Sequence, residues 1–351
     1  ARYNSTIVDW GDYDGNNSKY AQEYFSGVDV SREGIYPDFL DFDGDGKADM
    51  MTYPTKSSYS SSDNAVLYQA YSPYGDVSFS KKCTLPLCSD FQALRYADLN
   101  GDGKMDVIRI QKVGKNNYRF DFYLFNGSSF VESGGFNNSD SRILTGDFNA
   151  DGKTEVLTRN AKVYNQSATE IASGGIDNWG TDYVSSYPNN NYLVDFNGDG
   201  KTDVLTMSGS ACWVYTLNGG TFTKLTSFSN SELRNWNFNY FGDFNGDGKT
   251  DVLCQSSSNF STVTLFLSTG KTFIKKQIVN HDIKAKVLVG DFNRDGRHDI
   301  LHLEPITGNK LKIKIGTFNG TNFDNEYYTT SLMTNGLIND DTQTGQSNLA
   351  V

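Results

Sequence analysis

The stretch DFNGDGKTDVL occurs twice without change, at 195–205 and 243–253, and looser copies of it recur along most of the chain. The first nine positions of these copies read D-x-[DN]-x-D-G-x-x-[DE], and consecutive copies start 57, 49, 48, 48 and 48 residues apart. Such regular spacing is typical of a repeat architecture and not of a single site. The six clear copies begin at Asp41, Asp98, Asp147, Asp195, Asp243 and Asp291.

A seventh, degenerate copy begins at Asp340, 49 residues after the sixth. Gly345 falls at its sixth position and Asn348 at its ninth, but Thr342 and Thr344 replace the acids of the motif. We interpret it as a repeat that has largely lost its metal positions.

The segments between the motifs have a β pattern. After the fourth copy come the runs DVLTM, CWVYTLN, FTKLTSF and NYFGD, which are rich in β-branched and aromatic residues and are separated by turn formers. We find no sustained helical periodicity. Four antiparallel strands in about 48 residues is the size of a propeller blade.

The two ends of the chain set the expected blade count. Before the first motif there is room for about three strands, near Ile7–Trp10, Tyr20–Phe25 and Pro37–Leu40, and after Asp340 for one or two. If the terminal strands pair within one blade, no sheet edge is left exposed. We therefore predict a single all-β domain over 1–351, a seven-bladed β-propeller of four-stranded antiparallel blades with one blade closed by both termini; six or eight blades are the alternatives.

The motif itself predicts a calcium site. Side chains at positions 1, 3 and 5 supply oxygens, Gly at position 6 permits a positive φ, and the carbonyl of position 7 and the acid at position 9 complete the set. An oxygen cage of this size is typical of calcium, and the motif offers no ligands for soft metals. An EF-hand is excluded, because that loop needs Glu at position 12 and flanking helices.

These motifs resemble the FG-GAP or VCBS calcium-binding repeat, found in integrin α-subunit propellers and in many large bacterial surface proteins. The resemblance covers nearly the full length and implies one calcium ion, about six in total, between the first and second strands of each blade. The third repeat departs from it by using Glu at position 9, and DYDGNNSKY from Asp12 matches only the start of the motif and is predicted to be a plain turn. The implied ligands, with position 7 contributing its carbonyl, are Asp41, Asp43, Asp45, Lys47 and Asp49; Asp98, Asn100, Asp102, Lys104 and Asp106; Asp147, Asn149, Asp151, Lys153 and Glu155; Asp195, Asn197, Asp199, Lys201 and Asp203; Asp243, Asn245, Asp247, Lys249 and Asp251; and Asp291, Asn293, Asp295, Arg297 and Asp299.

Charge supports this interpretation over Asx-rich turns that never bind metal. The six loops concentrate 19 carboxylates, and six Ca²⁺ would bring +12 against a formal charge of −11. The negative charge also argues against a nucleic-acid partner, and the lack of any apolar run of 18 residues argues against a membrane span.

The predicted ligand-binding loops lie opposite the calcium turns. Exposed aromatic rings beside Asn, Asp and Ser suit a sugar or a peptide, although the same rings could instead seal gaps between blades. The candidate contacts are Trp179, Asp182, Tyr183 and Tyr187 in Ser173–Asn191, and Trp236 in Ser229–Asn239.

We expect a non-catalytic binding or adhesion module for an extracellular glycan or protein, secreted or at the cell surface, where millimolar calcium would fill such sites. A scaffold domain of a larger RHS- or SpvB-type surface or toxin-like protein, and then a polysaccharide-acting enzyme, are the alternatives. The start ARYNST, without Met, predicts a processed or excised piece of a longer polypeptide. The three histidines have no identifiable Ser or Cys partner and are expected to have packing or surface roles. Among the cysteines, Cys83 and Cys88 could form a disulfide, whereas Cys212 and Cys254 are expected to be buried thiols.

Overall fold

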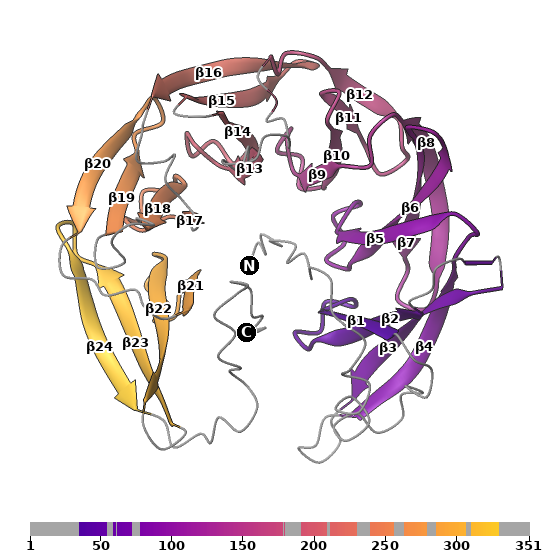
Figure 1. Ribbon diagram of the computed structural model, residues 1–351, viewed down its shortest axis with the longest axis horizontal. Coiled ribbons are helices and arrows are strands. Elements are labelled where there is room, and N and C mark those ends of the chain that lie inside the picture. Colours follow the sequence, from indigo (N-terminus) through magenta and orange to yellow (C-terminus); the bar gives the residue numbers. More distant parts are fainter. Residues whose placement is uncertain are drawn as a thin grey trace. The chain divides into compact units, whose positions relative to one another are not determined.

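The computed structural model consists of β-strands joined by turns and loops in the part of the chain that it describes (Figure 1). Its strands form six sheets, each with four strands, and every pairing is antiparallel. The described residues are 35–54, 59–60, 62–71, 78–177, 179, 191–208, 211–229, 239–255, 263–278, 286–306 and 310–329.

The chain divides into two compact units with three consecutive sheets each. The first unit comprises 1–147, 151–173 and 348–351, and the second comprises 148–150 and 174–347. The strands of the first unit are β1 (Ile35–Leu40), β2 (Asp49–Pro54), β3 (Asn64–Tyr71) and β4 (Ser78–Pro86); β5 (Phe91–Ala97), β6 (Asp106–Gly114), β7 (Asn117–Phe125) and β8 (Phe130–Asn138); and β9 (Ile143–Gly146), β10 (Glu155–Thr158), β11 (Lys162–Tyr164) and β12 (Glu170–Ser173).

The strands of the second unit follow the same order of four. They are β13 (Asn191–Val194), β14 (Asp203–Ser208), β15 (Ala211–Asn218) and β16 (Thr221–Ser229); β17 (Asn239–Gly242), β18 (Asp251–Gln255), β19 (Val263–Ser268) and β20 (Phe273–Ile278); and β21 (Lys286–Gly290), β22 (Asp299–Ile306), β23 (Lys310–Phe318) and β24 (Phe323–Thr329).

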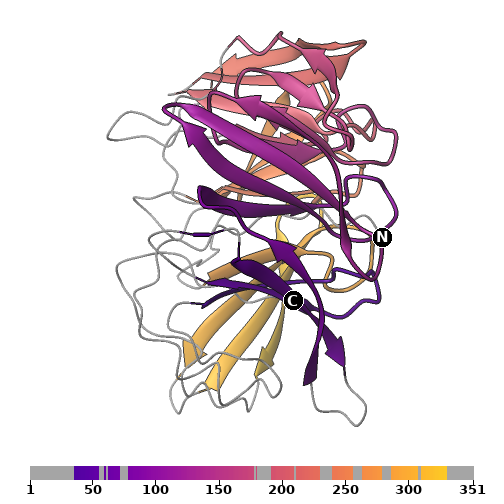
Figure 2. The same cartoon turned by 90° about the vertical axis from the view of Figure 1, so that its right-hand side faces the viewer.

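Every sheet is a meander, in which each strand pairs with the next strand along the chain (Figures 1 and 2). The second strand is the most buried: all four residues of β10 and the first four of β2 are inaccessible to solvent or nearly so. The fourth strand is more accessible: β4 and β8 have nine residues each, of which only two are buried. This gradient explains why the second strands read as continuous apolar runs, since both of their faces are packed.

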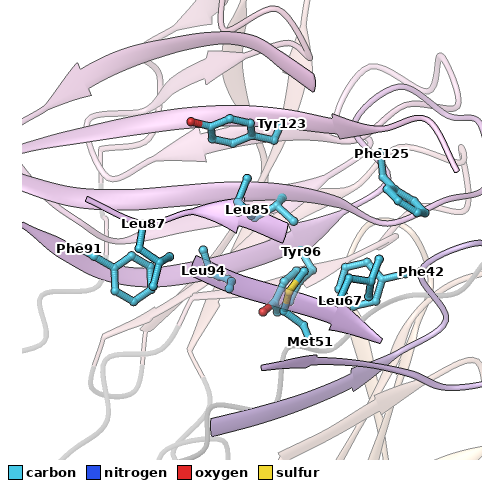
Figure 3. Close-up of a cluster of buried hydrophobic side chains, with 12 residues drawn as sticks. Phe42, Met51, Leu67, Leu85, Leu87, Phe91, Leu94, Tyr96, Tyr123 and Phe125 are labelled. Atoms are coloured by element: carbon cyan, nitrogen blue, oxygen red, sulfur yellow. The ribbon is translucent and has the colours of Figure 1, made fainter. Parts of the chain in front are cut away.

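Neighbouring sheets within a unit pack face to face through shared apolar clusters. In the first unit, Phe42, Met51 and Leu67 of the first repeat meet residues of β5–β8, and the Phe42 and Tyr96 rings lie edge to face at 5.3 Å (Figure 3). The second and third sheets meet where Phe136 stacks on Tyr164 at 3.7 Å. In the second unit, two further clusters join β13–β16 to β17–β20 and β17–β20 to β21–β24.

The structure confirms the all-β, four-stranded organisation predicted from the sequence. The runs DVLTM, CWVYTLN and FTKLTSF lie in β14, β15 and β16, whereas NYFG forms β17 and so opens the next sheet. Six sheets fit one of the predicted blade counts. The segments expected to form a shared seventh blade, Ile7–Trp10, Tyr20–Phe25 and the copy at 340, lie outside the described residues.

The predictions for the cysteines and for a membrane span can also be compared with the structure. Cys212 and Cys254 are buried thiols, as predicted. Cys83 and Cys88, for which a disulfide was possible, are free and half-buried. Among the residues that the structure describes, no helix has the length and apolar character needed to cross a membrane.

Candidate metal-binding loops

All six sequence motifs occupy the turn between the first and second strands of their sheets, as predicted. The Asp at position 1 follows the first strand directly, and the acid at position 9 is the first residue of the second strand. In the fifth loop, for example, Asp243 follows β17 and Asp251 begins β18. The repeat therefore places the same set of oxygen-bearing side chains at the same end of every sheet.

The Asp at position 1 organises each loop through backbone hydrogen bonds. In all six loops the N–H of position 5 donates to its Oδ1 at 3.1 Å. The N–H of the position 6 glycine donates to its Oδ2 at 2.8–3.0 Å. The N–H of position 7 donates to the Asp at position 5 at 2.8–3.0 Å. A carboxylate has about four lone-pair sites, so these bonds fix the side chains and still leave acceptor capacity for a cation.

The loop needs a left-handed backbone at two positions. The position 6 glycines have φ values of 80–86°, which confirms the role predicted for them. Position 4 also has positive φ in all six loops, including the non-glycine residues Ala150 at 62° and Arg294 at 63°. The sequence motif, which leaves position 4 unspecified, did not reveal this second requirement.

The acid at position 9 is buried in all six loops, with at most 2% of its surface exposed. In the fifth loop Asp251 Oδ2 accepts the Phe244 N–H at 3.0 Å, and Oδ1 accepts the Ser268 N–H at 2.8 Å. Asp106 is held in the same way by Leu99 and Phe125. Because burial penalises the charged form, it raises the pKa of Asp106 and of Asp251 to about 7.

Asp203, at position 9 of the fourth loop, accepts fewer hydrogen bonds than Asp106 or Asp251. Its Oδ2 accepts the Phe196 N–H at 3.1 Å, but its buried Oδ1 has no hydrogen-bond partner in the part of the chain that the structure describes. The Thr216 hydroxyl lies close enough to lower the pKa of Asp203, although its buried Oγ1 also has no hydrogen-bond partner among the described residues. Burial dominates and raises the pKa of Asp203 to about 7. An unpaired buried carboxylate oxygen is costly unless a proton or a cation reaches it.

Two loops bring three carboxylates together. Asp41, Asp43 and Asp49 each offer one oxygen, and these oxygens all lie within 4.8 Å of one another. Asp147, Asp151 and Glu155 form a matching group, so the longer side chain at position 9 of the third loop still reaches its neighbours. The donors are oxygens throughout, which fits a hard cation and does not fit a soft transition metal.

In the first, second and fifth loops, the lysine at position 7 lies on the Asp at position 5. The ammonium–carboxylate distances are 2.5 Å for Lys47–Asp45, 3.1 Å for Lys104–Asp102 and 3.2 Å for Lys249–Asp247. The side-chain hydrogen bond from Lys47 lowers the pKa of Asp45. These partly exposed pairs offset part of the negative charge of their own three loops, and the position 7 carbonyls remain predicted ligands.

The candidate ligand contacts on the opposite loops are only partly described. Trp179 is half-buried. Asp182, Tyr183, Tyr187 and Trp236 lie outside the described residues.

Comparison with known proteins identifies the repeat. The FG-GAP-like repeat family matches residues 98–158, 195–254 and 243–302. These ranges contain the second to sixth motifs, and the matches begin at the position 1 aspartates Asp98, Asp195 and Asp243. A comparison with curated proteins found no match.

Solved structures similar to the chain include propeller-type lectins. A lectin from Agrocybe aegerita that recognises non-reducing terminal N-acetylglucosamine has 17% identity and a TM-score of 0.61, with 84% of this chain and 80% of that chain covered. The Photorhabdus luminescens Tc holotoxin pore has 14% identity and a TM-score of 0.39, and the match spans 77% of this chain but only 13% of that one. The V. cholerae biofilm matrix protein Bap1 has 15% identity and a TM-score of 0.37, with 84% of this chain and 52% of that chain covered.

The family match and the fold likeness agree with the six repeated loops and their four-stranded sheets. The chain therefore carries FG-GAP-like repeats and has the all-β fold of the β-propellers.

Proposed function

We propose that this protein is a calcium-stabilised, non-catalytic binding module of the extracellular space, which uses the loops opposite its calcium turns to bind a carbohydrate or protein ligand. The observation that carries the calcium part is the buried acid at position 9, which recurs in all six loops together with three further oxygen-bearing side chains at positions 1, 3 and 5. Six buried acids at equivalent positions are costly in a protein that gives them no cation. Plain Asx turns do not need an acid that is buried at the start of the second strand.

The role of the residues follows from their geometry. The Asp at position 1 is held by backbone N–H groups, so its carboxylate is oriented before any ion arrives. The position 9 acid is fixed both by its own turn and by the third strand, as Asp251 is by Phe244 and by Ser268 of β19. Calcium would supply positive charge at the centre of this set and would join the start of the second strand to the turn. Calcium would stabilise the fold and would not act in catalysis, because the protein itself supplies the ligands of each loop.

Calcium removal tests this part of the proposal. A site at a calcium concentration 100 times its Kd adds about 2.7 kcal/mol of stability. We therefore expect EDTA to lower the melting temperature substantially, and added calcium in excess of the chelator to restore it. Magnesium should restore much less, because it requires a stricter octahedral shell.

A matched pair of variants shows whether the effect comes from the loops. Asp247→Asn removes one charge at the partly exposed position 5 of the fifth loop, and Glu132→Gln removes one charge from an exposed site on β8. Calcium should stabilise Asp247→Asn less than the parent and Glu132→Gln as much as the parent. A melting temperature that EDTA leaves unchanged contradicts the proposal.

The ligand part of the proposal rests on the fold likeness to a lectin and on Trp179, a half-buried aromatic side chain in a loop opposite the calcium turns. A binding panel should include glycans with non-reducing terminal N-acetylglucosamine, other glycans and extracellular proteins, each in calcium and in EDTA. We expect saturable binding that Trp179→Ala weakens. Cleavage of a glycan by the purified protein would instead show an enzyme.

A further inference from the structure

The position 1 aspartates of the fourth and fifth loops are held from outside their own loops. Thr250, at position 8 of the fifth loop, donates its backbone N–H to the Asp195 carbonyl at 2.8 Å and accepts the Asp195 N–H on Oγ1 at 3.0 Å. His298, at position 8 of the sixth loop, donates its backbone N–H to the Asp243 carbonyl at 2.7 Å and accepts the Asp243 N–H on Nδ1 at 3.1 Å. Each of these aspartates is thus fixed on both sides of its backbone by the following repeat.

The fifth repeat also contacts the next three residues of the fourth loop, 196–198. Ser268 Oγ on β19 donates to the Phe196 carbonyl at 2.6 Å, and this bond is buried. A Cβ on Gly270 would lie 3.4 Å from the Asn197 Cα, and a Cβ on Gly198 would lie 3.2 Å from the Lys249 side chain. The stretch 195–198, which contains the first two predicted ligands, is therefore built against the fifth repeat.

The backbone hydrogen bond from position 8 to the preceding loop also occurs in the first unit. Met105 N–H donates to the Phe42 carbonyl at 3.0 Å, and Thr154 N–H donates to the Asp98 carbonyl at 3.1 Å. A Cβ on Gly44 would lie 2.7 Å from the Gly103 carbonyl oxygen. Position 8 of one repeat thus contacts the start of the preceding loop in both units.

From these contacts we infer that position 8 is a positioning residue for the cation site of the preceding loop, with Thr250 serving the fourth loop and His298 the fifth. The inference rests on the proposed calcium binding. Without the Thr250 hydroxyl, the Asp195 N–H would lose its partner, and the first ligand of the fourth loop would be less firmly oriented. The ligands of the fifth loop, to which Thr250 belongs in sequence, keep their own hydrogen bonds.

The test compares Thr250→Val, which keeps the shape and loses the hydroxyl, with Thr250→Ser, which keeps the hydroxyl. Calcium affinity is measured by isothermal titration calorimetry on the full chain, in two backgrounds. Asp199→Asn disables the fourth loop, and Asp247→Asn disables the fifth. We expect Thr250→Val to weaken binding about fivefold at one site in the Asp247→Asn background and to have no effect in the Asp199→Asn background. Thr250→Ser should bind like the parent.

A second pair keeps the test decisive if Thr250→Val does not fold. His298→Leu removes the acceptor for Asp243, and His298→Thr restores one of the type found at position 250. His298→Leu should weaken one site when the fifth loop is intact and none when Asp247→Asn disables it. An effect of Thr250→Val that persists in the Asp199→Asn background, or no effect with the fourth loop intact, would overturn the inference while leaving calcium binding in place. A parent protein that binds no calcium would remove the proposed function and this inference together.

Discussion

At the scale of single residues, the acid at position 9 most strongly constrains what the loops can do. Its carboxylate is buried in every repeat, and the only favourable outcomes for a buried carboxylate are protonation, hydrogen bonding or a cation. Asp251 has both oxygens hydrogen-bonded, whereas Asp203 has one oxygen without a partner. The same side chain therefore stabilises the protein in its cation-bound or protonated form and destabilises it in its bare ionised form.

This leads to a prediction for calcium-free protein, prepared in metal-stripped buffer. Burial raises the pKa of Asp106, Asp203 and Asp251 from 3.8 to about 7, so the folded state holds more protons than the unfolded state between these values. Their contribution is fully present below pH 3.8 and is lost as the pH rises through 7. Urea unfolding should show the calcium-free protein losing stability between about pH 4 and pH 7.

Saturating calcium should reverse that trend, because calcium competes with protons for the same carboxylates. The contribution of one group is isolated by Asp251→Asn, which should flatten the slope of the calcium-free protein. A calcium-free protein whose stability rises steadily over this window would show that these acids are not buried as described.

Gly103 and Gly44 are needed for different physical reasons, and substituting each glycine with alanine should distinguish the two reasons. Gly103, at position 6, has φ of +84° and open space where a Cβ would lie, so Gly103→Ala should cost only the left-handed strain of about 1–2 kcal/mol. Gly44, at position 4, has φ of +77° and would bring its Cβ to 2.7 Å from the Gly103 carbonyl oxygen. Chemical denaturation should therefore show Gly44→Ala to be clearly more destabilising than Gly103→Ala. Equal costs would contradict the close approach of the two loops.

At the scale of elements, an apolar residue at position 2 joins five of the loops to the core, since Phe42, Leu99, Phe148, Phe196 and Phe244 are fully buried. Phe244 is fully buried and meets the Phe323 ring edge to face at 5.9 Å, so it links the turn after β17 to β24. We expect Phe244→Ala to cost about 3–5 kcal/mol in chemical denaturation. Ile274→Ala on β20, where 51% of the side chain is exposed, should cost much less. A small loss for Phe244→Ala would show that the turn is stable without its apolar anchor.

Most of the elements could be predicted from the sequence, because each strand carries its own local pattern. The runs 203–207, 212–218 and 222–228 coincide with β14, β15 and β16, and the motif marks the turn after every first strand. The contacts of Thr250 and His298 with the preceding loop could not be predicted, since they depend on how one sheet lies against the next. Strand length could not be predicted from the motif spacing either. The third sheet has strands of only three or four residues, although the motif spacing is the usual 48.

At the scale of the whole molecule, the repeat gives two units of three sheets whose acidic loops carry 19 carboxylates. The formal charge of −11 means that six divalent ions would bring the protein close to neutrality. Because we propose one calcium ion for each loop, the number of bound ions is a property of the whole chain that can be counted.

The most direct measurement of the central claim is the number of calcium ions bound per chain, by equilibrium dialysis of metal-stripped protein followed by elemental analysis. We expect about six ions per chain, one for each intact loop, because each loop supplies the ligands of a single site. Asp247→Asn should bind one ion fewer, and Glu132→Gln should bind as many as the parent. Protein that retains no calcium, or a count that Asp247→Asn leaves unchanged, would contradict the account.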